Sequence, residues 1–148
     1  MKVLHISNFL PNSHKIAGGA EQAAIRLINL LIKENIDISV LTTINDFTKI
    51  NFNFTQYEVN TIETKYNNKK FLQSKVIGLQ YDSIVSKEVK QIFKKDKPDI
   101  VHLHNICYLT FSLIDEIIKF NIPIIMSIYD YWIFCPTNML LKEDNTMC

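Results

Sequence analysis

Two of the three glycines in the chain, Gly18 and Gly19, stand side by side between a strand-like run and a helix-like run. Glycine is useful where the backbone adopts a positive φ angle or must approach another group closely. A helix that begins here would present unpaired N–H groups and the positive end of its dipole to a phosphate or carboxylate. The spacing is neither GxGxxG nor GxxxxGKS/T, which disfavours a dinucleotide fingerprint and a P-loop. The pair therefore indicates either contact with an anionic ligand or a plain tight turn.

Two histidines, His102 and His104, lie two residues apart in the segment DIVHLH and so point to the same face of a strand. This spacing permits metal ligation, but intracellular zinc sites usually have three or four recognisable ligands, and the sequence indicates no third. Packing of one histidine among core residues is the simpler interpretation, and we predict no metal site. At the exit of the strand, His104 and Asn105 are well placed to hydrogen-bond a hydroxyl-rich ligand.

The segment Tyr129-Asp130-Tyr131-Trp132 gathers the single tryptophan of the chain, two tyrosines and a carboxylate. This combination is typical of sugar sites, where aromatic faces meet C–H surfaces and carboxylates accept hydrogen bonds from hydroxyl groups. The alternative is a loop whose aromatic rings cover the sheet with their polar tips satisfied. The composition of the segment favours the sugar site.

Alternating strands and helices must position these residues. Hydrophobic periodicity predicts strands at 2–7, 36–42, 99–104 and 123–128, and helices at 20–35, 71–95 and 111–120. The polar, asparagine-rich stretch 46–70 is expected to be a variable excursion that contains a short strand at 57–62. The alternation predicts an α/β fold: a Rossmann-like three-layer domain with a mostly parallel sheet and helices on both faces.

In such sheets, ligands bind outside the carboxyl ends of the strands. The informative residues are therefore those that follow each predicted strand, at 8–19, 43–46, 104–108 and 129–136. We expect the glycine pair, the HLHN exit and the aromatic segment to converge on one cleft.

The 148 residues, 47% hydrophobic and 21% charged, predict one globular domain with a proper core. The formal charge of +1 gives no field that would attract nucleic acid, so none is expected as a partner.

The apolar runs are far shorter than a membrane span, and no leader precedes the first strand, which predicts a cytoplasmic protein and leaves peripheral contact with the inner membrane face open. The odd count of cysteines (Cys107, Cys135 and Cys148) favours reduced thiols over a disulfide frame, and buried structural thiols are the simpler interpretation of Cys135 and Cys148.

Three segments, MKVLHISNFLPNSHKIAGGAE, KPDIVHLHN and SIYDYWIFCPTNMLLKEDNTMC, resemble in the same order the N-terminal domain of the family 4 glycosyltransferases. These are retaining enzymes of the two-domain GT-B architecture. The resemblance covers nearly the whole chain and is weakest between residues 46 and 95. It implies that Gly18 and Gly19 lie beside the diphosphate of a nucleotide-sugar, and that His104 and Asn105 line the acceptor side of the cleft.

The resemblance also implies catalytic positions for Tyr129 and Asp130 and acceptor contacts for Tyr131 and Trp132. The family usually has histidine directly before this aspartate, where the present chain has Tyr129. Tyrosine, with a reference pKa of about 10, is a poor base at neutral pH but still hydrogen-bonds a sugar hydroxyl. Retaining transfer in the family is thought to use the departing phosphate to take the acceptor proton.

The expected activity is hexosyl transfer from a nucleotide-sugar to a glycan or lipid-linked acceptor in polysaccharide biosynthesis. The nucleotide-sugar is a substrate, and neither a cofactor nor an obligatory metal is expected. A GT-B enzyme also needs a C-terminal donor-binding domain, so residues 1–148 are expected to be a fragment that is inactive alone. The alternative is a non-catalytic glycan-binding or interaction module derived from a degenerate transferase domain. A flavodoxin-like or NAD-linked protein would need a cofactor loop that the sequence lacks.

Overall fold

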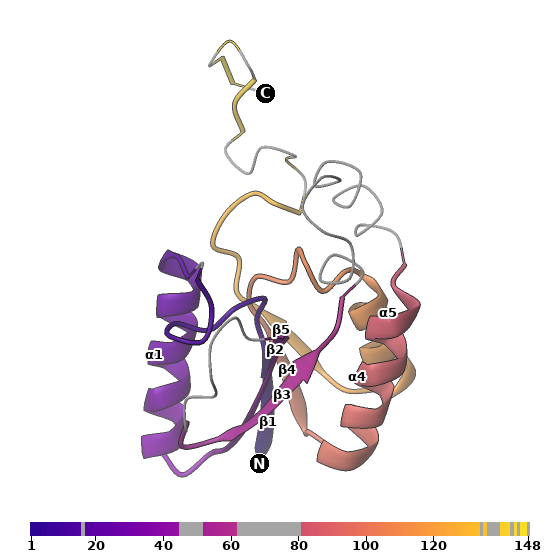
Figure 1. The fold of residues 1–148 in the computed structure, drawn as a ribbon. Helices are drawn as coiled ribbons and strands as arrows, with labels where there is room; N and C mark the ends of the chain where they lie inside the picture. The colour runs from indigo at the N-terminus through magenta and orange to yellow at the C-terminus, as the bar shows by residue number, and fades with distance from the viewer. Residues whose placement is uncertain are drawn as a thin grey trace.

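The computed structural model describes residues 1–15, 17–44, 52–61, 81–133, 135, 140–142, 144, 146 and 147. Its centre is a five-stranded sheet in which every pair of neighbouring strands is parallel (Figure 1). The strands are β1 (Lys2–Ile6), β2 (Asp37–Thr43), β3 (Thr55–Val59), β4 (Ile100–Leu103) and β5 (Ile124–Met126), and their order is β3-β2-β1-β4-β5. The predicted Rossmann-like α/β fold is therefore confirmed.

Helices cover both faces of the sheet. Figure 1 shows α1 (Gly19–Lys33) on one side, and α4 (Ser83–Asp96) and α5 (Ser112–Lys119) together on the other. Alternate residues of β1 enter the two layers, since Val3 packs with Ile28 of α1 whereas Leu4 packs with Phe93 of α4. This alternation is the period-2 geometry of a strand that is buried on both faces.

Side-chain hydrogen bonds hold the starts of α4 and α1. The carboxylate of Asp82 accepts hydrogen bonds from the N–H groups of Ile84 and Val85, so α4 begins at Ser83. The prediction of a helix over 71–95 was therefore wrong at residues 81 and 82, and residues 71–80 lie outside the described part of the chain. At the start of α1, a side-chain oxygen of Glu21 accepts from the N–H of Gly18.

The strand predicted at 57–62 is shifted and belongs to the sheet. The observed strand β3 ends at Val59, because the N–H of Asn60 then donates to a carboxylate oxygen of Glu88 on α4 at 2.8 Å. The excursion predicted at 46–70 thus returns to pair with β2, while residues 46–51 and 62–70 lie outside the described ranges. The other predicted strands and helices differ from the observed ones by one or two residues at their ends.

No helix within the described ranges has the length and apolar character that a bilayer crossing requires.

Candidate functional site

The ends of three strands are tied together at the carboxyl edge of the sheet. After β1, the N–H of Asn8 donates to the carbonyl oxygen of Asn105, which follows β4, at 2.7 Å. The side chains of the two asparagines are also joined, from Nδ2 of Asn8 to Oδ1 of Asn105 at 2.9 Å. At the end of β2, the hydroxyl of Thr43 donates to the carbonyl oxygen of Asn8 at 2.8 Å. This edge is therefore a hydrogen-bonded platform built by β1, β2 and β4.

The aromatic segment after β5 joins the same platform through Tyr129. The hydroxyl of Tyr129 and Nδ1 of His104 are hydrogen-bonded at 2.9 Å. His104 is fully buried, whereas Tyr129 is 39% exposed. The tyrosine hydroxyl thus connects a buried imidazole to the molecular surface. The structure thus brings together the residues that follow β1, the residues that follow β4, and Tyr129 of the aromatic segment.

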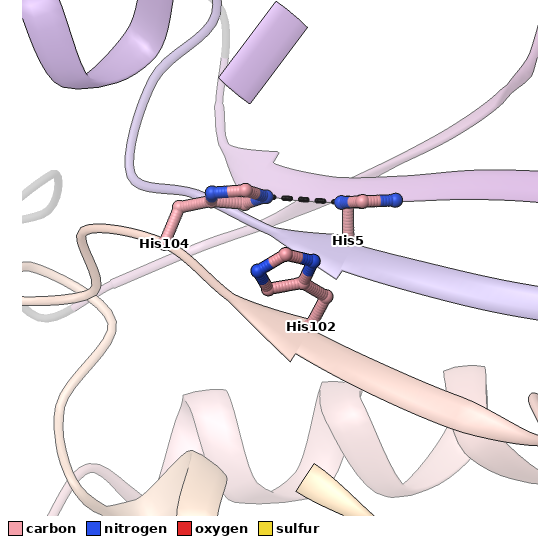
Figure 2. Close-up of side chains that lie close together, drawn as sticks. All are labelled: His5, His102 and His104. Atoms are coloured by element: carbon pink, nitrogen blue, oxygen red, sulfur yellow. Dashed lines mark hydrogen bonds between the residues drawn. The ribbon is translucent and has the colours of Figure 1, made fainter. Parts of the chain in front are cut away.

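Behind Tyr129 lies a cluster of three histidines, shown in Figure 2. His5 of β1 is the register partner of His102 of β4, so their side chains lie on the same face of neighbouring strands. Nδ1 of His5 and Nε2 of His104 are 2.9 Å apart, and Nε2 of His102 lies 2.9 Å from the hydroxyl oxygen of Ser127. The rings of His102 and His104 stack with centroids 4.4 Å apart. We call His5, His102 and His104 the histidine cluster.

Burial keeps the histidine cluster neutral at neutral pH. Removal from water, together with the repulsion that a protonated His102 would exert, lowers the pKa of His5 to about 4. Removal from water and the two neighbouring rings lower the pKa of His104 to about 3, and burial also lowers the pKa of His102. Each neutral imidazole carries one N–H group and one lone pair. Nε2 of His5 is buried without a hydrogen-bond partner among the described residues.

His5 is the site residue that the sequence reasoning missed. The sequence indicates no third ligand beside His102 and His104, yet in the structure His5 of β1 offers a ring nitrogen within 4.8 Å of theirs. The sequence does place His5 within the first strand, on the same face as Val3. Sequence patterns alone do not give the pairing of β1 with β4, which joins residues almost a hundred positions apart.

The glycine pair begins α1, where it was expected, but its backbone is ordinary. Gly18 has a φ of −93°, and neither Gly18 nor Gly19 adopts a positive φ. A Cβ atom added to Gly19 would meet nothing within 4 Å, and one added to Gly18 would meet only a carboxylate oxygen of Glu21 at 3.4 Å. A tight turn with positive φ therefore does not account for this pair, and neither does close packing among the described residues.

The remaining aromatic residues divide between the surface and the core. Tyr131 is 45% exposed, whereas Trp132 is buried and stacks on Phe111 with ring centroids 6.1 Å apart. Asp130 shapes the turn between them, because one of its carboxylate oxygens accepts from the N–H of Trp132 at 3.0 Å. Trp132 thus has the covering position that the alternative interpretation of this segment described, and the acceptor contacts assigned to Tyr131 and Trp132 stay predictions.

Two of the three cysteines lie within the described residues. The sulfur of Cys107 accepts a hydrogen bond from Nδ2 of Asn8 at 3.2 Å, and that of Cys135 accepts from the N–H of Leu140 at 3.2 Å. Cys148 lies outside the described ranges.

No protein-family model matches the chain, and a search of curated proteins finds no significant match.

Proposed function

We propose that this domain is the acceptor-side half of a retaining glycosyltransferase of the GT-B type. With a C-terminal nucleotide-binding domain as its partner, it would transfer a hexose from a nucleotide-sugar to a glycan or lipid-linked acceptor, at the cytoplasmic side of a membrane. The supporting observation is the hydrogen-bonded edge at which His104, Asn105 and Tyr129 meet the exit of β1. A doubly covered parallel sheet binds its ligands at this edge.

The glycine pair supports binding of the nucleotide-sugar at this edge of the sheet. Neither backbone conformation nor packing among the described residues requires glycine at position 18 or 19, and this supports a role for the pair in leaving room for a ligand. The first N–H groups of α1 and the positive end of its dipole suit a diphosphate. We infer that Gly19 in particular leaves room for the phosphate oxygens, since a Cβ atom there would project into open space.

In the proposed reaction, the bond between the anomeric carbon and the donor phosphate breaks, and a bond to the acceptor oxygen forms on the same face of the sugar. The departing diphosphate takes the acceptor proton and is stabilised by the N-terminus of α1. Tyr129, held by His104, orients the acceptor hydroxyl, and Asp130 accepts hydrogen bonds from the sugar while it shapes the turn. No step uses a cofactor or a metal.

The test is nucleotide release by the full-length protein in the presence of a panel of nucleotide-sugars and acceptors. Gly19→Val should raise the donor KM or abolish release without disturbing the fold, because the structure leaves the space beside Gly19 empty. Gln22→Val, on the exposed side of the same turn, is the matched control and should keep its activity. If no donor releases nucleotide, and Gly19→Val binds every donor as the unaltered protein does, the proposal fails.

A non-catalytic glycan-binding module is the second candidate, and the hydrogen bond from Tyr129 to His104 favours it. A tyrosine that replaces the family's histidine and is hydrogen-bonded from behind suits recognition of a hydroxyl better than removal of its proton. Tyr129→His in the full-length protein separates the two candidates. Higher turnover indicates an enzyme with a weakened site, whereas glycan binding without turnover in both forms indicates the module.

A further inference from the structure

We propose that His5, His102 and His104 bind one divalent transition-metal ion of the zinc class, which would link β1 to β4. This site goes beyond the proposed sugar transfer, which needs no metal. The three side chains come from two neighbouring strands and are shown together in Figure 2.

The first argument is distance. Each histidine offers a ring nitrogen, and the three nitrogens lie within 4.8 Å of one another. Zinc–nitrogen bonds of about 2.0–2.1 Å in a tetrahedral arrangement place ligand nitrogens roughly 3.3 Å apart. The closest pair, Nδ1 of His5 and Nε2 of His104, is 2.9 Å apart, so a bound ion would replace the proton between these two nitrogens and separate them by only a few tenths of an ångström.

The second argument is the orientation of the rings. Nε2 of His102 is hydrogen-bonded to the hydroxyl of Ser127, and Nδ1 of His104 is hydrogen-bonded to the hydroxyl of Tyr129, each at 2.9 Å. Metal-binding histidines commonly use one ring nitrogen for the ion and hold the other in a hydrogen bond that fixes the ring. The outer nitrogens of both rings are held in this manner, which leaves Nδ1 of His102 and Nε2 of His104 for an ion.

The third argument is the spare binding capacity of His5. Its Nε2 is buried without a hydrogen-bond partner among the described residues, although buried polar atoms in native proteins are nearly always paired. The hydrogen bond to His104 uses Nδ1, so only one of the two ring nitrogens of His5 has a partner among the described residues. The His5 ring, whose centroid lies 5.1 Å from that of His102 and 5.2 Å from that of His104, is thus incompletely satisfied by the described residues.

The donor set indicates which ion fits. The described cluster contains three imidazoles and no carboxylate, and imidazole favours Zn²⁺, Co²⁺, Ni²⁺ or Cu²⁺ over Mg²⁺ or Ca²⁺. Three protein ligands would leave a fourth tetrahedral position for water. Because no carboxylate offsets the charge of the buried ion, binding is expected to be weaker than in sites with thiolate or carboxylate ligands.

Cobalt is the best probe, because tetrahedral Co²⁺ absorbs visible light and its thiolate complexes add a separate charge-transfer band. We expect the full chain to take up one Co²⁺ with a saturable visible spectrum, without the thiolate band, and to lose the colour when Zn²⁺ is added. His102→Gln should weaken uptake at least tenfold while leaving the hydrogen bond between His5 and His104 in place. Zn²⁺ should also raise the Tm of the unaltered protein and not that of this variant.

His14 provides the matched control. It is buried like the cluster histidines, but its ring bonds to the backbone of Leu10 and Thr43 instead of to another histidine. His14→Gln should bind Co²⁺ as the unaltered protein does. The proposal is overturned if the folded, unaltered protein shows no saturable uptake, if a thiolate band accompanies binding, if His14→Gln loses binding, or if a folded His102→Gln binds equally well. Should circular dichroism show that His102→Gln does not fold, the spectrum and stoichiometry of the unaltered protein still decide the matter.

Discussion

Tyr129 lies at the outer end of a hydrogen-bond chain that continues through His104 to His5. Because burial keeps both rings neutral, each has one donor and one acceptor nitrogen, and the chain can run in two directions. In one direction Tyr129 donates inward and accepts from a ligand. In the other it accepts from His104 and donates its proton outward. The direction of the chain thus decides which kind of ligand group Tyr129 meets.

Removing the hydroxyl of Tyr129 should cost stability as well as activity. Tyr129→Phe leaves Nδ1 of the buried His104 without its partner, and such a loss destabilises by about 1–3 kcal/mol. Urea denaturation measures this change, and nucleotide release by the full-length protein measures the loss of turnover. Tyr131→Phe, at the exposed neighbour, should change the free energy of unfolding by less. Equal effects of the two substitutions would contradict the role given to the hydrogen bond.

A second buried network predicts how stability responds to alkali. The carboxylate of Asp96 accepts from the hydroxyls of Tyr57 and Ser39 and pairs with Lys2 at 2.9 Å. Removal from water, then the hydrogen bond to Asp96, raises the pKa of Tyr57 to about 12, and the hydrogen bond to Asp96 also raises the pKa of Lys2. Asp37 raises both pKa values as well, and Lys95 lies 5.7 Å from the centroid of the Tyr57 ring.

The raised pKa values of Tyr57 and Lys2 both predict a lower free energy of unfolding at alkaline pH. Above pH 10 the unfolded chain releases the Tyr57 proton while the folded chain retains it, so the free energy of unfolding should fall as the pH rises from 10 towards 12. Lys2 adds to the fall above its ordinary pKa of 10.5. Denaturant titrations at a series of alkaline pH values check this expectation, and Tyr57→Phe should show a smaller decline. An unchanged slope in Tyr57→Phe would mean that this tyrosine does not contribute.

Sequence reasoning named the outer residues of the candidate site but not His5 in its interior. His104, Asn105 and Tyr129 each follow a recognisable strand, and the rule that ligands bind at strand ends brings such residues together. His5 lies inside a strand, where it looks like one more core position. Only the register between β1 and β4 reveals its neighbours, and hydrophobic periodicity carries no information about register.

At the scale of elements, side-chain hydrogen bonds account for the differences between the predicted and observed bounds at α4 and β3. Apolar spacing extends the predicted second helix back to residue 71, but it cannot show that Asp82 adopts an extended conformation and binds the N–H groups of the next turn. For β3, the predicted strand at 57–62 ended too late, because the hydrogen bond from Asn60 to Glu88 follows the end of the strand at Val59. Side-chain bonds to distant elements are invisible to a local pattern.

The cap of α4 can be tested alone. Asp82→Ala removes an acceptor for the N–H groups of Ile84 and Val85, and the loss of an N-cap typically costs about 1 kcal/mol. The free energy of unfolding in urea measures the change. Lys87→Ala, at an exposed position of the same helix, should leave stability nearly unaltered. An equal loss in both variants would mean that the cap does not hold this helix end.

At the scale of the whole molecule, the edge strand β5 carries exposed apolar side chains. Ile125 is 50% exposed on β5, and Ile128 beyond it is 61% exposed. Open strand edges with apolar side chains promote association between chains. We therefore expect the isolated chain to self-associate as its concentration rises, and we expect Ile125→Lys to reduce that association. Sedimentation velocity at several concentrations measures it.

Ile118 is the matched control for this surface, because it is 63% exposed but lies on helix α5. Ile118→Lys should leave the sedimentation behaviour unchanged. If both lysine variants lower association equally, general solubility and not the strand edge is responsible.

The architecture itself was predictable, since buried strands that alternate with helices give a parallel sheet with covered faces. The strand order was not, and it places the first strand of the chain at the centre. Val3 pairs with Ile38 of β2 and with Ile100 of β4. One edge of β1 can therefore pair early during synthesis, whereas the partner of the other edge is made about sixty residues later. During that interval a ribosome-bound chain would leave one edge of its central strand unpaired. A chaperone that binds unpaired strand edges would act mainly in this period.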